Sequence, residues 1–165
     1  MTTASEVPVP GPIFPSRCKT NAPSLGPAGT PTSARAAPRV LVVDDEGAIC
    51  GLLSIYLGQK GLEVATVQRA GEARVIIERG QFDLVLLDWK LDGVEGLDLL
   101  HLSKVRHPDI PVIIYTGADL NEGSLVSGLA READAVIPKM GPLDALSKAI
   151  FRHLDQRQAG PRKAA

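Results

Sequence analysis

Residues 82–90 read Phe-Asp-Leu-Val-Leu-Leu-Asp-Trp-Lys, and this stretch indicates the fold. Four apolar residues, Leu84 to Leu87, follow one another without alternation and end at the carboxylate of Asp88. An unbroken apolar run of this length is typical of a strand covered on both faces, as in a parallel sheet with helices on either side. A residue at the carboxyl end of such a strand lies in the crevice where open α/β sheets bind ligands. Taken alone, an aspartate at the end of a strand is more often a solvated residue than a binding residue. The choice between these two interpretations depends on the rest of the sequence.

The rest of the chain alternates apolar runs with amphipathic stretches. From Ile49 the apolar residues recur at helical spacing, and Gly61 closes that helix. The sequence predicts strands at 40–43, 62–67, 82–88, 111–115 and 133–137, and helices at 49–61, 70–78, 95–106, 121–130 and 142–154. Alternating strands and helices with short, right-handed connections form a doubly wound parallel sheet. We therefore expect an α/β domain with five strands, five helices and three layers.

The two ends of the chain differ in composition from its middle. Residues 1–38 contain eight prolines and few large apolar side chains. Such a segment cannot bury enough surface to offset the entropy that it loses on ordering. We expect residues 1–38 to be a disordered, passive extension and residues 156–165 to be a frayed tail. The folded domain would then cover residues 39–155.

Charge and composition argue against several classes of function. Residues 40–155 hold 18 acidic and 11 basic residues, a net charge of −7, whereas binding to a phosphate backbone needs a clustered basic surface. Direct nucleic-acid binding is therefore not expected. The sequence has no apolar run long enough to span a membrane and no secretory signal, and Cys18 and Cys50 lack the spacing of a metal or redox site. These features predict a protein of the reducing cytoplasm.

Five polar residues are expected to meet at one edge of the sheet, because the carboxyl ends of parallel strands lie along the same edge. They are Asp44 and Asp45 after the first strand, Asp88 after the third, Thr116 after the fourth and Lys139 after the fifth. Neighbouring carboxylates repel one another, and a hard cation such as Mg²⁺ with oxygen ligands relieves this repulsion. A site that combines carboxylates, a metal cation, a lysine and a hydroxyl is typical of proteins that bind phosphoryl oxygens. A carboxylate in such a site can also act as a nucleophile.

Each of these residues also has a simpler interpretation. Asp44 and Asp45 could merely cap the first helix, where aspartate is favoured and complements the helix dipole. Lys139 could be a surface lysine, and Thr116 could be a turn former. The convergence of all five residues on one edge favours the phosphoryl site over these alternatives.

The ordered set of motifs resembles the receiver domain of two-component response regulators, from Val40 to about Leu154. The matching segments are Leu-Val-Val-Asp-Asp-Glu at 41–46, Phe-Asp-Leu-Val-Leu-Leu-Asp at 82–88, Leu91 followed by Gly93 and Gly96, Pro-Val-Ile-Ile-Tyr-Thr at 111–116, Ala-Asp at 133–134 and Pro-Lys at 138–139. Each segment is weak alone, but their order and spacing together are specific. The resemblance implies a flavodoxin-like fold, which is the doubly wound sheet expected above.

The resemblance also implies a role for each residue of the site. Asp88 would be the phospho-accepting aspartate, converted to 4-aspartylphosphate, and Mg²⁺ would be the cofactor. Asp45 would bind Mg²⁺ directly and Asp44 through water. Asp88 and the backbone carbonyl of Lys90 would be further ligands.

The remaining implied roles concern the phosphoryl group and its source. Lys139 would pair with the acceptor carboxylate and later with the phosphoryl group, and Thr116 would donate to a phosphoryl oxygen. The donor would be a phosphohistidine of a sensor histidine kinase or of a histidine phosphotransfer protein. The chain would be a signalling phospho-acceptor, which catalyses only its own phosphorylation and dephosphorylation. Because too few residues follow Leu154 for an output domain, we expect output through an unidentified downstream protein or a homodimer, or a role as a phosphate sink.

Three residues depart from the family's pattern. Met140 follows Lys139 where the family usually has proline, often with a cis bond; a non-proline cis bond costs about 3 kcal/mol or more, so we expect a trans bond here. Val136 stands where the family usually has a switching aromatic residue. Tyr115 is a doubtful substitute, because strand alternation points its side chain to the face opposite that of its neighbour Thr116. Asp92 replaces a proline and predicts a looser, more acidic loop. These departures predict phosphorylation with an altered or small output signal.

Two other functions compete with this one. A pseudo-receiver that is not phosphorylated and serves as an interaction module would accommodate Val136 and Met140. A phosphatase of the haloacid dehalogenase type would need a second aspartate two residues after Asp88, where this sequence has Lys90. The phosphatase is therefore disfavoured.

Overall fold

Five parallel strands form the central sheet of the computed structural model, which describes residues 37–91, 94–117 and 131–158. The order across the sheet is β2-β1-β3-β6-β7. The bounds are Arg39–Val43 for β1, Glu63–Val67 for β2, Leu84–Leu87 for β3, Val112–Thr116 for β6 and Ala135–Pro138 for β7. All neighbouring strands in this sheet are parallel. The predicted doubly wound parallel sheet is thus confirmed, with strand ends shifted by at most two residues.

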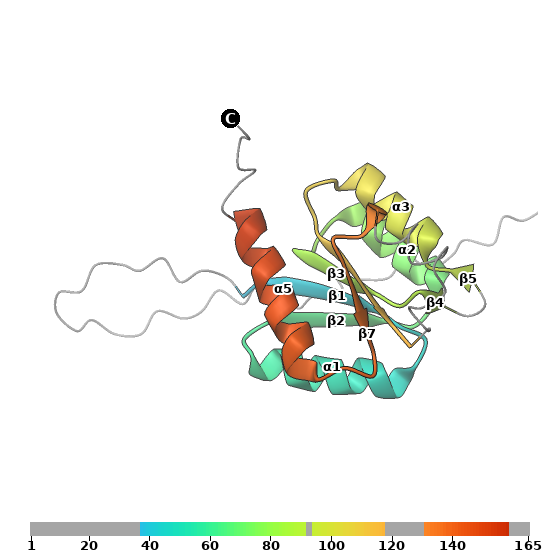
Figure 1. The fold of residues 1–165 in the computed structure, drawn as a ribbon. Helices are drawn as coiled ribbons and strands as arrows, with labels where there is room; N and C mark the ends of the chain where they lie inside the picture. Colours follow the sequence, from blue (N-terminus) through green and yellow to red (C-terminus); the bar gives the residue numbers. More distant parts are fainter. Residues whose placement is uncertain (1–36, 92–93, 118–130, 159–165) are drawn as a thin grey trace, which may run out of the picture.

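Four described helices cover the two faces of the sheet (Figure 1). Helices α1 (Gly47–Gln59) and α5 (Leu143–Gln158) pack on one face, and α2 (Ala70–Arg79) and α3 (Leu97–Arg106) pack on the other. The predicted helix at 121–130 lies outside the described residues, as does nearly all of the predicted N-terminal extension. Within the described ranges, every helix is too short or too polar to cross a lipid bilayer.

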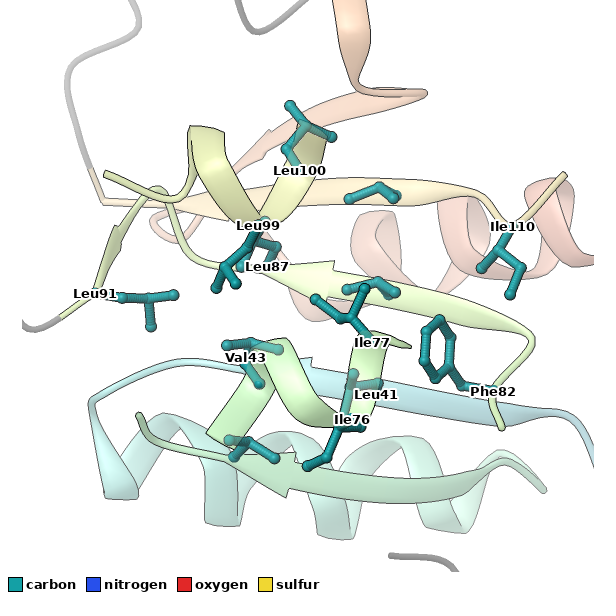
Figure 2. Close-up of a cluster of buried hydrophobic side chains, with 14 of the residues drawn as sticks. Leu41, Val43, Ile76, Ile77, Phe82, Leu87, Leu91, Leu99, Leu100 and Ile110 are labelled. Atoms are coloured by element: carbon teal, nitrogen blue, oxygen red, sulfur yellow. The ribbon is translucent and has the colours of Figure 1, made fainter. Parts of the chain in front are cut away.

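The apolar run of β3 serves both faces of the sheet, because successive side chains of a strand point to opposite faces. Val85 and Leu87 belong to the core cluster under α2 and α3, whereas Leu84 and Leu86 belong to the cluster under α1 and α5. Figure 2 shows the first cluster, in which Ile77 of α2 faces the sheet. A fully buried side chain of this size contributes about 1.5–3 kcal/mol. Burial on both faces explains why the run does not alternate.

A short antiparallel hairpin follows β3 and was not predicted. Strand β4 (Lys90–Leu91) pairs with β5 (Val94–Glu95), and α3 begins only at Leu97. The sequence had predicted a turn here and a helix from residue 95, because two-residue strands leave no periodicity to detect. Residue 92 lies outside the described residues, so the looser loop expected from Asp92 stays a prediction.

Helix α5 extends three residues beyond the predicted domain boundary at 155. Its Arg157 donates from Nη1 to Oδ1 of Asp83 at 2.7 Å and to the Asp83 carbonyl at 3.2 Å. Oδ2 of Asp83 accepts a hydrogen bond of 2.8 Å from the amide of Arg39. The start of β1, the residue before β3 and the last turn of α5 are thereby joined. The prediction of a frayed tail is wrong for residues 156–158.

Candidate functional site

Two buried carboxylates follow neighbouring strands. Asp44 comes directly after β1 and Asp88 directly after β3, and the last residues of these strands, Val43 and Leu87, are paired in register. The Asp88 amide donates to the Val43 carbonyl at 2.8 Å, which continues the ladder one residue past the strands. Asp44 is 2% exposed and Asp88 is 6% exposed. Carboxylates buried to this extent need a partner that compensates for the loss of water.

Lys139 is that partner. It follows β7, and its amide donates to the Thr116 carbonyl at 2.8 Å. Its Nζ atom lies 2.8 Å from Asp44 Oδ2, 2.9 Å from Asp88 Oδ2 and 2.9 Å from Glu46 Oε1. Three residues that the sequence predicted for the site are thus in direct contact.

Burial and pairing act in opposite directions on these groups. Burial raises the pKa of Asp44 above its ordinary value, and hydrogen bonds from Lys139 and from the Glu46 amide offset only part of this effect. Burial alone would lower the pKa of Lys139, but hydrogen bonds to Asp44, Asp88 and Glu46 outweigh it and raise that pKa. The ammonium group of Lys139 therefore stays protonated at neutral pH.

A pocket of about 330 Å³ opens over these groups. It is lined by Asp45, Glu46, Asp88, Lys90, Thr116, Gly117 and Lys139. Thr116 is buried, whereas Asp45 and Lys90 are exposed at the rim. A water molecule occupies about 30 Å³. The pocket can therefore hold a phosphoryl group together with several water molecules. Every predicted site residue either lines this pocket or, in the case of Asp44, contacts the Lys139 side chain that lines it.

The oxygen donors of the pocket fit a hard cation. Asp44, Glu46 and Asp88 can each offer one carboxylate oxygen, and these atoms lie within 4.8 Å of one another. Mg²⁺ prefers such ligands and keeps several waters. Within the described ranges this closest group contains Glu46, whereas the predicted ligand Asp45 lines the same pocket outside the group. Glu46 was part of the sequence motif but was not predicted as a site residue, although its place as the third acid in a row was a usable signal.

The segment after Asp88 approaches the pocket through its backbone. The Lys90 amide lies 3.4 Å from Asp88 Oδ1, which makes a weak hydrogen bond. The Gly96 amide donates to the Trp89 carbonyl at 2.7 Å, and a Cβ atom at Gly96 would lie 2.6 Å from the Asp88 carbonyl oxygen. Only glycine therefore permits this approach. The Lys90 carbonyl as a metal ligand stays a prediction.

Residues of the α1 and α5 side support the site from behind. Cys50 donates from Sγ to the Asp44 carbonyl at 3.2 Å, and burial raises the pKa of its thiol, so that it stays protonated. Tyr115 packs in the core cluster on this side, whereas Val136 packs against the cluster on the other side. Tyr115 and Val136 thus occupy opposite faces of the sheet. No described peptide bond is cis, which confirms the predicted trans bond before Met140.

Comparison with known proteins points to one family. The model of the response regulator receiver domain matches residues 40–151. The transcriptional regulatory protein AruR of Pseudomonas aeruginosa is 37% identical over 138 residues, which cover 78% of this chain and 56% of AruR. A solved receiver domain protein from Methanospirillum hungatei is 35% identical, with a TM-score of 0.68 over 74% of this chain and 98% of that one. The response regulator TrrA of Thermotoga maritima, solved in complex with Mg²⁺ and BeF, is 30% identical, with a TM-score of 0.63 over 70% of this chain and 98% of that one.

Several of the curated relatives are named as transcriptional regulators and are longer than this chain. The chain spans about half of their length or less. Their names contrast with the expectation that nucleic acid is not a partner, which was drawn from the acidic charge of residues 40–155. The family match lies within that same acidic segment.

Proposed function

Because the chain belongs to the response regulator receiver family, we propose that Asp88 accepts a phosphoryl group from a phosphohistidine of a histidine kinase or phosphotransfer protein. One observation carries the proposal. The carboxylate of Asp88 is almost fully buried, yet it lines a pocket and lies 2.9 Å from the ammonium group of Lys139. A carboxylate placed in this way combines an accessible nucleophile with a cation that can bind the transferred group.

In the proposed reaction, an oxygen of the Asp88 carboxylate attacks the phosphorus atom. The P–N bond to the donor histidine breaks, and its electron pair stays on the imidazole nitrogen. The product is an acyl phosphate on Asp88. Lys139 stays protonated and exchanges its contact with the carboxylate for one with a phosphoryl oxygen, and the hydroxyl of Thr116 donates to another. Mg²⁺, when bound, neutralises negative charge on the phosphoryl oxygens.

We propose Asp45 as a direct ligand of Mg²⁺ and Asp44 as a ligand through water, with Asp88 and the Lys90 carbonyl as further ligands. Asp44 and Asp88 belong to the group of acids whose oxygens lie within 4.8 Å of one another. Asp45 and Lys90 line the same pocket. Lys139, which bonds to both buried carboxylates, balances part of their charge before the ion binds.

Phosphorylation of the full chain with acetyl phosphate and Mg²⁺ tests the proposal. Intact mass spectrometry should show one added phosphoryl group in the wild-type protein and none in Asp88→Asn. Asp144→Asn is a matched control, since Asp144 is an exposed aspartate on α5 away from the pocket, and this variant should be labelled like wild type. An unlabelled wild-type protein, or a labelled Asp88→Asn variant, would contradict the proposal.

We further propose that output passes through contact with another protein or with a second copy of the chain, and that the signal is small. Val136, which replaces the usual aromatic residue, packs against the core on the α2 and α3 side. A valine has no ring that could turn between inward and outward positions. Amide NMR spectra with and without beryllofluoride should therefore differ mainly around the pocket. Large shifts throughout β7 and α5 would contradict a small signal.

One observation favours a second function, that of an unphosphorylated interaction module. Lys139 already contacts three carboxylates, so that the charge of the pocket is partly balanced without a metal ion. Such a module would take up no phosphoryl group in the experiment above and would bind its partner equally well as wild type and as Asp88→Asn.

A further inference from the structure

The backbone of Lys139 is held by two successive residues of the neighbouring strand. Its amide donates to the Thr116 carbonyl at 2.8 Å, and its carbonyl accepts a long and therefore weaker hydrogen bond from the Tyr115 hydroxyl at 3.5 Å. Strand β7 ends at Pro138, so both bonds act on the first residue beyond the ladder. The short amide bond holds the point from which the lysine side chain extends into the pocket, and the longer hydroxyl bond adds a second contact there.

The chain that follows Lys139 offers this residue little support. The side chain of Met140 is 94% exposed, and the Gly141 amide turns back to the Pro138 carbonyl at 3.1 Å. Helix α5 begins only at Leu143. The backbone of Lys139 is therefore held by its bonds to β6, while its side chain is held by the ion pairs with Asp44, Glu46 and Asp88.

Tyr115 is well placed to act as a fixed anchor. It is 4% exposed, and it packs with Val42, Leu53 and Ile113 in the core cluster that includes residues of α1 and α5. Packing of the ring on this side leaves the hydroxyl little freedom. Burial raises the pKa of the phenol, so that it remains a hydrogen-bond donor at neutral pH. A phenylalanine at this position would keep the packing and lose only the donor.

We propose that Tyr115 is a positioning residue for phosphoryl transfer, in that its hydroxyl holds the Lys139 peptide and so directs the ammonium group at Asp88. This inference rests on the proposed function. The lysine side chain must reach Asp44, Glu46 and Asp88 from a single starting point. A small displacement of that point moves the ammonium group away from the place where the transferred group arrives.

Tyr115→Phe is the test, and Tyr56→Phe is its matched control. These are the two tyrosines of the chain, and the Tyr56 hydroxyl lies 3.4 Å from Ser147 Oγ, between α1 and α5 rather than at the pocket. Phosphorylation of each full-length variant is measured over a range of Mg²⁺ and acetyl phosphate concentrations. Tyr115→Phe should lower the maximal rate by about twofold, the lower end of the effect of losing one hydrogen bond, because this bond is long. Its half-saturating Mg²⁺ concentration should not change, and Tyr56→Phe should match wild type in both.

A second measurement separates positioning from a general loss of stability. The ¹³C chemical shift of the Lys139 carbonyl should move in Tyr115→Phe and stay unchanged in Tyr56→Phe, because only the first hydroxyl bonds to it. If the wild type is phosphorylated and Tyr115→Phe reaches the same maximal rate, this inference alone is overturned. The same holds if the ¹³C chemical shift of the Lys139 carbonyl does not change in Tyr115→Phe. A wild-type protein that takes up no phosphoryl group would overturn the proposed function, and this inference with it.

Discussion

The Nζ atom of Lys139 lies 2.9 Å from Oδ2 of Asp88, so that the proposed phospho-acceptor and the cation that would bind its product are already in contact. The same ammonium group contacts the buried carboxylate of Asp44. On the proposed function, this arrangement would give Lys139 two separable roles, one in stability before any phosphate arrives and one in the transfer itself.

Replacing Lys139 by alanine should destabilise the protein when Mg²⁺ is absent. The change leaves two buried carboxylates without their cation, and removing one partner of a buried ion pair costs about 3–5 kcal/mol. Mg²⁺ stabilises both proteins because it binds the folded state. It should raise the free energy of unfolding more in this variant than in wild type, because the buried carboxylates of the variant have no lysine to balance their charge. Urea unfolding with and without Mg²⁺ measures both effects.

Lys148→Ala is the control for that experiment. Lys148 pairs with Asp144 at 2.7 Å on the surface of α5, where solvent screens the pair, and its removal should not change the unfolding curve. Equal unfolding midpoints for Lys139→Ala and wild type without Mg²⁺ would contradict the stabilising role of Lys139.

The two exposed acids of the pocket should differ in their effect on Mg²⁺ binding. We expect Asp45→Asn to weaken binding by about tenfold or more, because even the loss of a group that supports a metal ligand costs about 10–100-fold. Glu46→Gln should have a smaller effect, because Glu46 contacts Lys139 and is not a proposed ligand. The fluorescence of Trp89, the one tryptophan of the chain and the residue after Asp88, reports the titration. The opposite ranking would replace Asp45 by Glu46 in the ligand set.

Adding one methyl group at Gly96 should damage the site, whereas the same change on α1 should not. In Gly96→Ala the new Cβ would lie 2.6 Å from the Asp88 carbonyl oxygen, and such overpacking costs about 1–3 kcal/mol. In Gly51→Ala, in the middle of α1, the Cβ meets no atom within 4 Å. That variant should be stabilised by about 0.5–1 kcal/mol, because alanine favours the helix. Chemical unfolding measures both, and a shift of the same sign in the two variants would contradict the prediction.

His153 should reduce stability as the solution becomes acidic. Burial lowers the pKa of this histidine below 6.5, and Arg152 and Lys104 act in the same direction while Asp134 opposes them. The unfolded chain therefore takes up the proton first, so that stability is lost as the pH falls below about 6.5 and levels off below the folded pKa. His153→Gln should flatten the unfolding free energy over this interval. His101→Gln, at a mostly exposed histidine, should leave the acid loss in place; equal curves for wild type and His153→Gln would refute the prediction.

The residues that meet at the pocket could be predicted because their signals are local. Asp44 and Asp88 end apolar runs, Lys139 follows a third run, and parallel strands bring such ends to one edge. The strands themselves could be predicted because their signals are local as well. A run of buried residues on both faces is visible without knowledge of its neighbours.

Other features depend on contacts that a local pattern does not contain. The Tyr115 hydroxyl reaches a carbonyl 24 positions further along the chain, and which carbonyl it meets depends on the register of β6 and β7. The reach of Glu46 to Lys139 spans 93 positions. The end of α5 likewise depends on Asp83, 74 positions away from Arg157. Periodicity predicted that these segments are helices and strands, but it could not predict which distant residues their side chains contact.

The link between Arg157 and Asp83 has a practical meaning for anyone who shortens this protein. Asp83 and Asp88 flank the same strand at opposite ends, so a fragment cut after Asp155 would retain all of the acids around the pocket. It would nevertheless melt earlier, because Asp83 at the amino end of β3 would lose its bonds to Arg157 and keep only those to Arg39. A low melting temperature of that fragment would then reflect the choice of cut rather than a weakness of the end of the sheet that carries the pocket.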